Sequence, residues 1–167
     1  MKTQKQRRKK FKTDYGKRLK ILKGRKPRIV LRKTNKYIIV QYVGSKEAKD
    51  KVILGLTSKK LLNYGWPKKF QGSLKSIPAS YLIGFLIGKK IVNEKLEMPI
   101  VDFGMIKNVH KTRIYACLKG LIDAEIKLKF NKEKSLFPDE NSIEGKNLKN
   151  DFSSEFKKIK LKIEQEK

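Results

Sequence analysis

The stretch PASYLIGFLIGKKIVNEKLEMPIVDFG, residues 78–104, decides the fold of this 167-residue chain. Pro78 suits the first turn of a helix, and the apolar spacing after it predicts a helix over 78–96. Residues 100–104 are typical of a short strand. A strand reached through a long helix is normally parallel to an earlier strand of the same sheet. The stretch therefore indicates an α/β fold.

The sequence on either side of this stretch supplies the other elements of the sheet. Runs rich in β-branched and aromatic residues predict strands over 28–34, 37–43 and 51–56, the first two joined by a tight turn at Asn35 and Lys36 and the last two by a loop over 44–50. A second long helix is predicted over 112–126, and residues 128–130 favour a short edge strand. The order β-β-β-α-β-α predicts a mixed sheet with a ribonuclease H-like layout.

Shorter apolar patterns flank this core. Asp14 and Gly24 suit the ends of a helix over 14–23, and a second short helix is predicted over 58–64. Gly84 and Gly88 lie four apart, which we interpret as allowing the helix to approach the sheet closely. In the last segment, part of the sequence alternates like a strand, but the apolar residues at helical spacing favour a helix. These residues are Phe152, Phe156, Ile159 and Ile163.

Charge divides the chain into three parts. There are 43 Lys and Arg against 16 Asp and Glu, a net charge of +27, and residues 1–36 hold 17 of the basic residues with only one acidic residue, Asp14. Residues 131–167 carry nine basic and eight acidic residues and are nearly neutral. We therefore expect a basic nucleic-acid-binding arm over 1–27, an α/β core over 28–130 and a polar C-terminal extension over 131–167. The extension should be separable from the binding function.

Composition also excludes several classes of protein. One cysteine cannot form an internal disulfide, and one cysteine with one histidine cannot make a zinc finger. The most apolar run, 77–87, has about half the roughly 20 residues that a membrane span needs. The basic start is not followed by the apolar stretch of a secretory signal, so we expect a cytoplasmic protein. Neither a cofactor nor a small-molecule substrate is expected, and a polyanion is the expected partner.

The sequence gives little support for a catalytic function. DFG at 102–104 matches a kinase motif, but the glycine-rich loop and the catalytic loop of kinases are missing. A metal-dependent nuclease on a ribonuclease H-like layout is the alternative function, and it needs clustered carboxylates. The first strand contains none, so Asp102 is interpreted as a structural acceptor for Arg or Lys. Cys117 reads as a buried hydrophobe, and His110 as a satisfied or RNA-facing side chain. A polybasic membrane-surface protein would need more bulky apolar residues in the arm.

Basic residues interleaved with planar ones are the strongest functional pattern. Arg28 and Arg32 should project from one face of the first strand, roughly 13 Å apart, which is about twice the spacing of successive phosphates. Both guanidinium groups could then grip one nucleic-acid backbone. The predicted binding residues are Arg7, Arg8, Lys9, Lys10, Lys12, Tyr15, Lys17 and Arg18 in the arm, Arg28, Arg32, Lys33, Asn35 and Lys36 on the hairpin, and in second rank Lys111 and Arg113.

Several long motifs in one order resemble a known family. KTDYGKRLKILKGRKPRIVLRKTNKYIIVQ at 12–41 is similar to the N-terminal signature of the large-subunit ribosomal proteins called L eighteen in archaea and bacteria and L five in eukaryotes. YGW at 64–66, GSLKSIPASYLIGFLIGKK at 72–90, DFG at 102–104, TRIYACLKGLIDA at 112–124 and LFPDENSIEGKNL at 136–148 follow in the family's order. The arm, the YGW loop and the length resemble the archaeal form.

The resemblance implies a role. Members of this family join 5S rRNA and a neighbouring 5S-binding ribosomal protein in the central protuberance, and help to attach that particle to the large-subunit (23S-type) rRNA. The charge pattern agrees with RNA as the partner. Because the major groove of an RNA helix is deep and narrow, we expect contacts to phosphates, 2′-hydroxyls and unpaired bases.

Overall fold

A four-stranded mixed sheet forms the centre of the molecule. The computed structural model describes residues 3, 5–47, 49–107, 109–128, 136–148 and 151–166. Within them the strands are β1 (Arg28–Lys33), β2 (Ile38–Lys46), β3 (Lys49–Thr57) and β4 (Ile100–Asp102). Their order across the sheet is β3-β2-β1-β4. The predicted α/β class is confirmed, and part of the edge strand expected over 128–130 lies outside the described residues.

The pairing of β1 explains how the sheet is assembled. β1 pairs antiparallel with β2, with Val30 opposite Gln41, and β2 pairs antiparallel with β3. On its other side β1 pairs parallel with β4, with Arg28 opposite Ile100. The parallel pairing requires a crossover, and helix α3 (Ile77–Asn93) makes it, as the sequence predicted. Most of the polar loop expected over 44–50 is strand instead, because β2 extends to Lys46 and β3 begins at Lys49.

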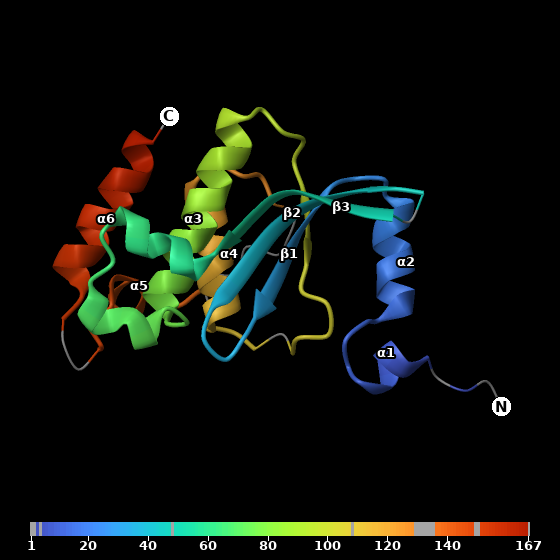
Figure 1. The fold of residues 1–167 in the computed structure, drawn as a ribbon, viewed down its shortest axis with the longest axis horizontal. Coiled ribbons are helices and arrows are strands. Elements are labelled where there is room, and N and C mark those ends of the chain that lie inside the picture. The colour runs from blue at the N-terminus through green and yellow to red at the C-terminus, as the bar shows by residue number, and fades with distance from the viewer. Residues whose placement is uncertain are drawn as a thin grey trace.

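One face of the sheet packs on the hydrophobic core. Ile29 and Leu31 of β1 and Val40 and Tyr42 of β2 are buried there, at the alternating positions that a strand directs to one side. Helices α3 and α4 (Arg113–Asp123) cover this face (Figure 1). Ser76 caps α3 by accepting a hydrogen bond from the Ala79 N–H, and Pro78 lies in the first turn.

Small residues bring α3 and α4 into close contact. A Cβ atom added to Gly84 would lie 2.2 Å from the Cys117 carbonyl oxygen, and one added to Gly120 would lie 2.2 Å from the Tyr81 carbonyl oxygen. A Cβ on Gly88 would lie 2.5 Å from the Ala124 Cβ. The prediction that Gly84 and Gly88 let α3 approach the sheet is therefore wrong. Gly84 and Gly88 face α4 instead.

The C-terminal segment belongs to the same core. The 3-10 helices η1 (Ser58–Tyr64) and η2 (Lys68–Ser73) lead into α3, and α5 (Glu140–Glu144) and α6 (Ser153–Gln165) lie on its outer side (Figure 1). The helix predicted for the last segment is confirmed. Phe152 lies 4.5 Å from Trp66 between ring centroids, and Phe156, Ile159 and Ile163 are buried in the core.

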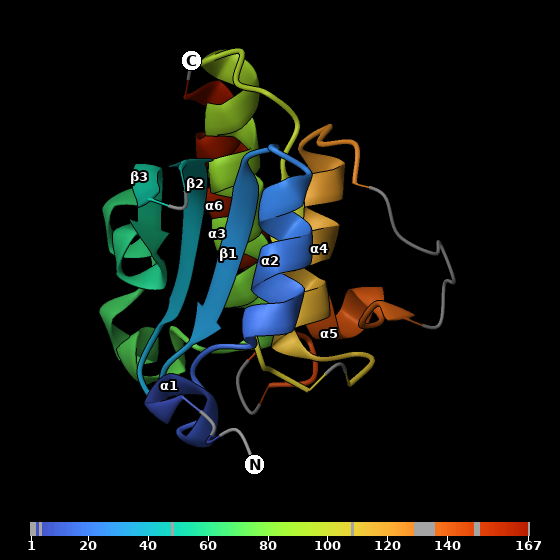
Figure 2. The same ribbon diagram turned by 90° about the vertical axis from the view of Figure 1, so that its right-hand side faces the viewer.

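The arm lies against the other face of the sheet. It contains one helical turn, α1 (Gln6–Lys9), and helix α2 (Tyr15–Lys23), and Figure 2 shows α2 alongside β1 and in front of α4, with β2 and β3 farther from it. The molecule thus has layers in the order arm, sheet, α3 with α4, and α5 with α6. None of the helices in the described ranges is both long and apolar enough to cross a membrane.

Candidate nucleic-acid interface

Helix α2 is placed over the sheet by local capping and by one ion pair. Asp14 caps α2, because its carboxylate accepts a hydrogen bond from the Lys17 N–H at 3.2 Å, and Gly24 ends the helix. This confirms the helix predicted over 14–23. Arg18 of α2 reaches across to Asp50 of β3, with 2.8 Å between Nη2 and Oδ2. The arm is therefore attached to the sheet by a charged contact rather than by a large apolar surface.

A groove of about 210 Å³ runs between the arm and the sheet. We call it the arm groove. It collects six basic side chains from the arm and β1, and three carboxylates. Its lining consists of Arg7, Lys12, Thr13, Asp14, Lys17, Arg18, Arg28, Val30, Arg32, Gln41, Val43, Asp50, Val52, Asp102 and Gly104.

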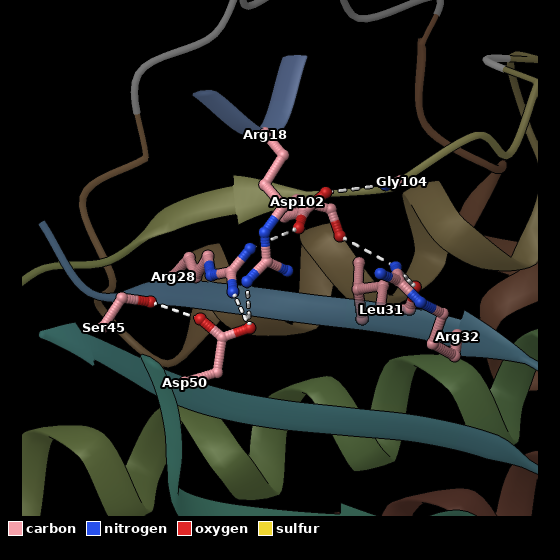
Figure 3. Close-up of polar contacts among 8 residues, drawn as sticks. All are labelled: Arg18, Arg28, Leu31, Arg32, Ser45, Asp50, Asp102 and Gly104. Carbon is pink, nitrogen blue, oxygen red and sulfur yellow. Dashed lines mark hydrogen bonds and ion pairs between the residues drawn. The ribbon is translucent and has the colours of Figure 1, made fainter. Parts of the chain in front are cut away.

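Arg28 is the buried centre of an ion-pair network in this groove (Figure 3). It is 3% exposed, its Nη2 lies 2.6 Å from Asp50 Oδ2, and its Nη1 lies 3.2 Å from Asp102 Oδ2. Burying a charge is costly unless it is paired, so both carboxylates are needed to hold Arg28 in place. Asp102 is thus the structural acceptor that the sequence predicted. Arg28 was predicted to bind phosphate, but its guanidinium is directed at these two carboxylates.

Arg32 lies on the same face of β1 and is less enclosed. Its Nη1 donates to the Leu31 carbonyl at 2.7 Å and to the Asp102 carbonyl at 3.4 Å. Gly104 has a positive φ of 62°, and a Cβ there would lie 3.1 Å from Arg32 Nη1. Glycine therefore both permits the turn after β4 and makes room for the guanidinium. The carbonyls fix one nitrogen, and the half-buried side chain still lines the groove.

Hydrogen bonds keep Asp50 ionised. Burial alone would raise its pKa, but hydrogen bonds from Ser45, Arg18 and Arg28 together with the charge of Arg28 outweigh burial and lower the pKa below its usual 3.8. The pKa of Asp14 is also lowered, chiefly by the hydrogen bond from Arg8 and then by that from the Lys17 backbone. Both carboxylates therefore stay negative at neutral pH and hold arginines of the arm and the sheet.

The remaining predicted arm residues are spread around the groove. Arg7 donates from Nε to the Thr13 hydroxyl at 3.1 Å, and Arg8 pairs with Asp14 at 2.8 Å. Lys5 lies over the Tyr15 ring, 4.7 Å from its centroid. The other predicted residues of the arm and the hairpin turn are exposed; they are Lys9, Lys10, Asn35 and Lys36.

A second cavity, of about 740 Å³, lies at the far end of β1 near the starts of α3 and α4. It brings together two further predicted residues, Lys33 and Arg113, with Lys107 and several apolar side chains. Lys111 lies nearby in the chain but pairs with Asp139 at 3.3 Å. The structure thus places some of the predicted residues in the arm groove and two in this cavity, and the others line neither.

Several residues of the candidate interface were not predicted from the sequence. Asp50 was placed in a polar loop, although the scarcity of acidic residues among so many basic ones is a signal that each is paired. Phe103 and Met105 line a second hollow beside the arm groove. Nothing in their local sequence marks them, because the turn after β4 brings them to the arm only in the folded chain.

The carboxylates of the groove are occupied by arginines. Asp14 pairs with Arg8, and Asp50 and Asp102 share Arg28. Across the described part of the chain, no group of three or more His, Cys, Asp or Glu side chains is arranged to hold a metal ion. The geometry therefore gives the nuclease alternative no specific support.

Fold and surface together define a small α/β protein with a strongly basic arm laid over a mixed sheet. The family described as "Ribosomal large subunit proteins 60S L5, and 50S L18" matches residues 1–98, more than half of the chain. The chain belongs to this family.

Relatives agree over most of the chain. The large ribosomal subunit protein uL18 of Korarchaeum cryptofilum is 44% identical over 142 residues, which cover 85% of this chain and 70% of that protein. The protein of the same name from Methanothrix thermoacetophila is 36% identical over 161 residues, covering 94% and 92%. That of Methanosphaera stadtmanae is 37% identical over 147 residues. The predicted resemblance to the archaeal form is confirmed, and with it a structural role in the large ribosomal subunit.

Proposed function

We propose that this chain binds 5S rRNA through the arm groove and the exposed cations around it, and helps to attach that RNA to the large-subunit rRNA in the central protuberance. A neighbouring 5S-binding ribosomal protein is the expected protein partner. The observation that supports the proposal most directly is the gathering of Arg7, Lys12, Lys17, Arg18 and Arg32 in one groove.

The charge balance of the groove favours a polyanion. Asp50 and Asp102 pair with Arg28, and Asp50 also pairs with Arg18, whereas Lys12, Lys17 and Arg32 form no ion pair within the described residues. Phosphates that neutralise such cations release counterions, which supplies much of the affinity for nucleic acid. Exposed Lys9, Lys10 and Lys36 extend this surface beyond the groove.

A matched pair of double variants tests the proposal. Lys12→Ala with Lys17→Ala removes two cations from the groove, and Lys59→Ala with Lys157→Ala removes two exposed cations from η1 and α6 on the opposite side. Affinity for 5S rRNA is measured over a range of salt concentrations. The first variant should flatten the log-log salt slope by about 1.4 to 1.8, and the second should leave it unchanged. Equal slopes in the two variants would contradict the assignment of the groove.

Competition tests the choice of RNA. The complex with 5S rRNA should resist an excess of an unrelated structured RNA of the same length, because shape and unpaired bases contribute beyond charge. Equal displacement by both RNAs would show general RNA binding only, without preference for 5S rRNA.

A further inference from the structure

An exposed aromatic residue occupies an unusual backbone position at the end of α1. The Lys12 N–H donates to the Arg7 carbonyl at 2.9 Å, and the Phe11 N–H donates to the Arg8 carbonyl at 3.0 Å. These two bonds form a Schellman motif, in which the residue with left-handed backbone is usually glycine. Phe11 holds that position with a φ of 51°. A residue with a Cβ is strained there by roughly 1–2 kcal/mol.

Packing inside the molecule does not compensate for this strain. Phe11 is 77% exposed, so its ring gains little from burial in the folded chain. Nevertheless its ring borders a hollow of about 390 Å³ that also contains Phe103, Met105 and Ile106. We call this hollow the aromatic pocket. Its size falls within the roughly 300–1,000 Å³ that is typical of pockets for small-molecule ligands.

The base of the aromatic pocket is fixed by the core. The Phe103 ring lies 6.5 Å from that of Tyr115 on α4, and the Arg8 Nη1 approaches the Met105 sulfur at 3.9 Å. Three cations border the pocket: Arg7, Lys12 and Arg32, all of which also line the arm groove. An apolar, aromatic hollow bordered by cations matches one ligand in particular, a flat base attached to phosphates.

We propose that the aromatic pocket binds one unpaired nucleotide of the RNA, with its base against Phe11 and its flanking phosphates at Arg7, Lys12 and Arg32. This inference rests on the proposed function and deepens it, because it names a base contact beside the phosphate contacts of the groove. Stacking of bases on aromatic side chains is how proteins commonly hold single-stranded RNA. The strain at Phe11 is then offset in the complex rather than in the free protein.

The test compares two substitutions of Phe11, one that removes the aromatic ring and one that keeps an aromatic face. Phe11→Gly relieves the backbone strain, so the free protein should be at least as stable as the wild type. Without the ring, its affinity for 5S rRNA should fall about 5- to 150-fold. Phe11→Trp keeps an aromatic face and should retain affinity. The matched control Leu161→Ala removes another exposed apolar side chain, 56% exposed on α6, and should bind as the wild type does.

Salt dependence separates failure of the pocket from failure of the proposed function. Because stacking releases no counterions, Phe11→Gly should keep the wild-type salt slope while its affinity falls at every salt concentration. If Phe11→Gly bound 5S rRNA with wild-type affinity and both proteins showed a steep salt slope, only the proposal for the aromatic pocket would be overturned. A shallow slope in the wild-type protein would overturn the proposed function itself.

Ultraviolet cross-linking of the wild-type complex locates the nucleotide. The peptide that contains Phe11 should cross-link to an unpaired position of 5S rRNA, and Phe11→Gly should lose that product. Cross-links from this peptide only to nucleotides inside RNA helices would overturn the inference, because a paired base cannot enter the pocket.

Discussion

Two arginines four positions apart on β1 have different surroundings and should respond differently to mutation. Arg28 is buried between Asp50 and Asp102, while Arg32 lines the groove with one nitrogen held by carbonyls. Lysine keeps the charge but cannot place two donors on two carboxylates. Arg28→Lys should therefore lower the free energy of unfolding by about 1–3 kcal/mol, measured by chemical denaturation.

Arg32→Lys should have the opposite signature. We expect nearly wild-type stability and a lower affinity for 5S rRNA at fixed salt, since the planar guanidinium suits phosphate and bases better than an ammonium. Loss of stability in Arg32→Lys, together with unchanged stability in Arg28→Lys, would show that the two roles are reversed.

Asp50 gives the folded protein a defined pH dependence. Its pKa is lower in the folded state than its usual 3.8, so its stabilising contribution is complete above about pH 4 and is lost as the pH falls through the folded-state value. Asp50→Asn should be less stable than the wild type at neutral pH. The difference should narrow as thermal melts are taken from pH 6 towards pH 2.5, and a constant difference would show that Asp50 does not titrate in this way.

At the scale of elements, the contact between α3 and α4 depends on the absence of a side chain. Gly120→Ala would place a Cβ 2.2 Å from the Tyr81 carbonyl, against backbone that cannot easily move. We expect a loss of about 1–3 kcal/mol or more in the free energy of unfolding. Gly72→Ala is the control, because nothing lies within 4 Å of its added Cβ. Similar stabilities for the two variants would contradict the close packing of the helices.

Helix α6 should be needed for stability. The tail was expected to be separable from binding, but Phe156 and Ile163 are buried in the core that also contains Tyr81 and Trp66. Phe156→Ala should cost about 3–5 kcal/mol of unfolding free energy. Any loss of RNA affinity in this variant should disappear at temperatures where it remains folded, and a persistent loss would place α6 in the RNA site.

The elements could be predicted because their signals are local. Runs rich in β-branched and aromatic residues predicted the strands. Pro78 predicted the start of α3, and Asp14 and Gly24 predicted the two ends of α2. Which element each buried residue packs against could not be predicted in this way. Gly84 fits a sheet or a helix equally well in the sequence, and the burial of Arg28 depends on Asp50 and Asp102, which are distant in the chain.

At the scale of the whole molecule, positive charge is concentrated at one end of the layered fold. Residues 1–12 contain seven of the 43 basic residues and no acidic residue. Their described contacts with the rest of the chain are exposed or only partly buried, so deleting them should change the melting temperature little. The log-log salt slope for 5S rRNA should become shallower by up to about 5 to 6.

A shuffled arm is the control for that deletion. A variant with residues 2–10 in scrambled order keeps the charge and should keep most of the salt slope. If the scrambled arm behaved like the deletion, charge alone would not account for the contribution of this segment.

The parallel pairing of β1 with β4 has a consequence for synthesis on the ribosome. The partner of Arg28 is Ile100, 72 positions later in the chain, so one edge of β1 stays open while the intervening residues are being made. The antiparallel hairpins can form first, and the nascent sheet then exposes an apolar edge that invites pairing with other chains. The basic arm is already complete at that stage. Mutual repulsion between such arms would keep nascent copies apart until β4 closes the edge.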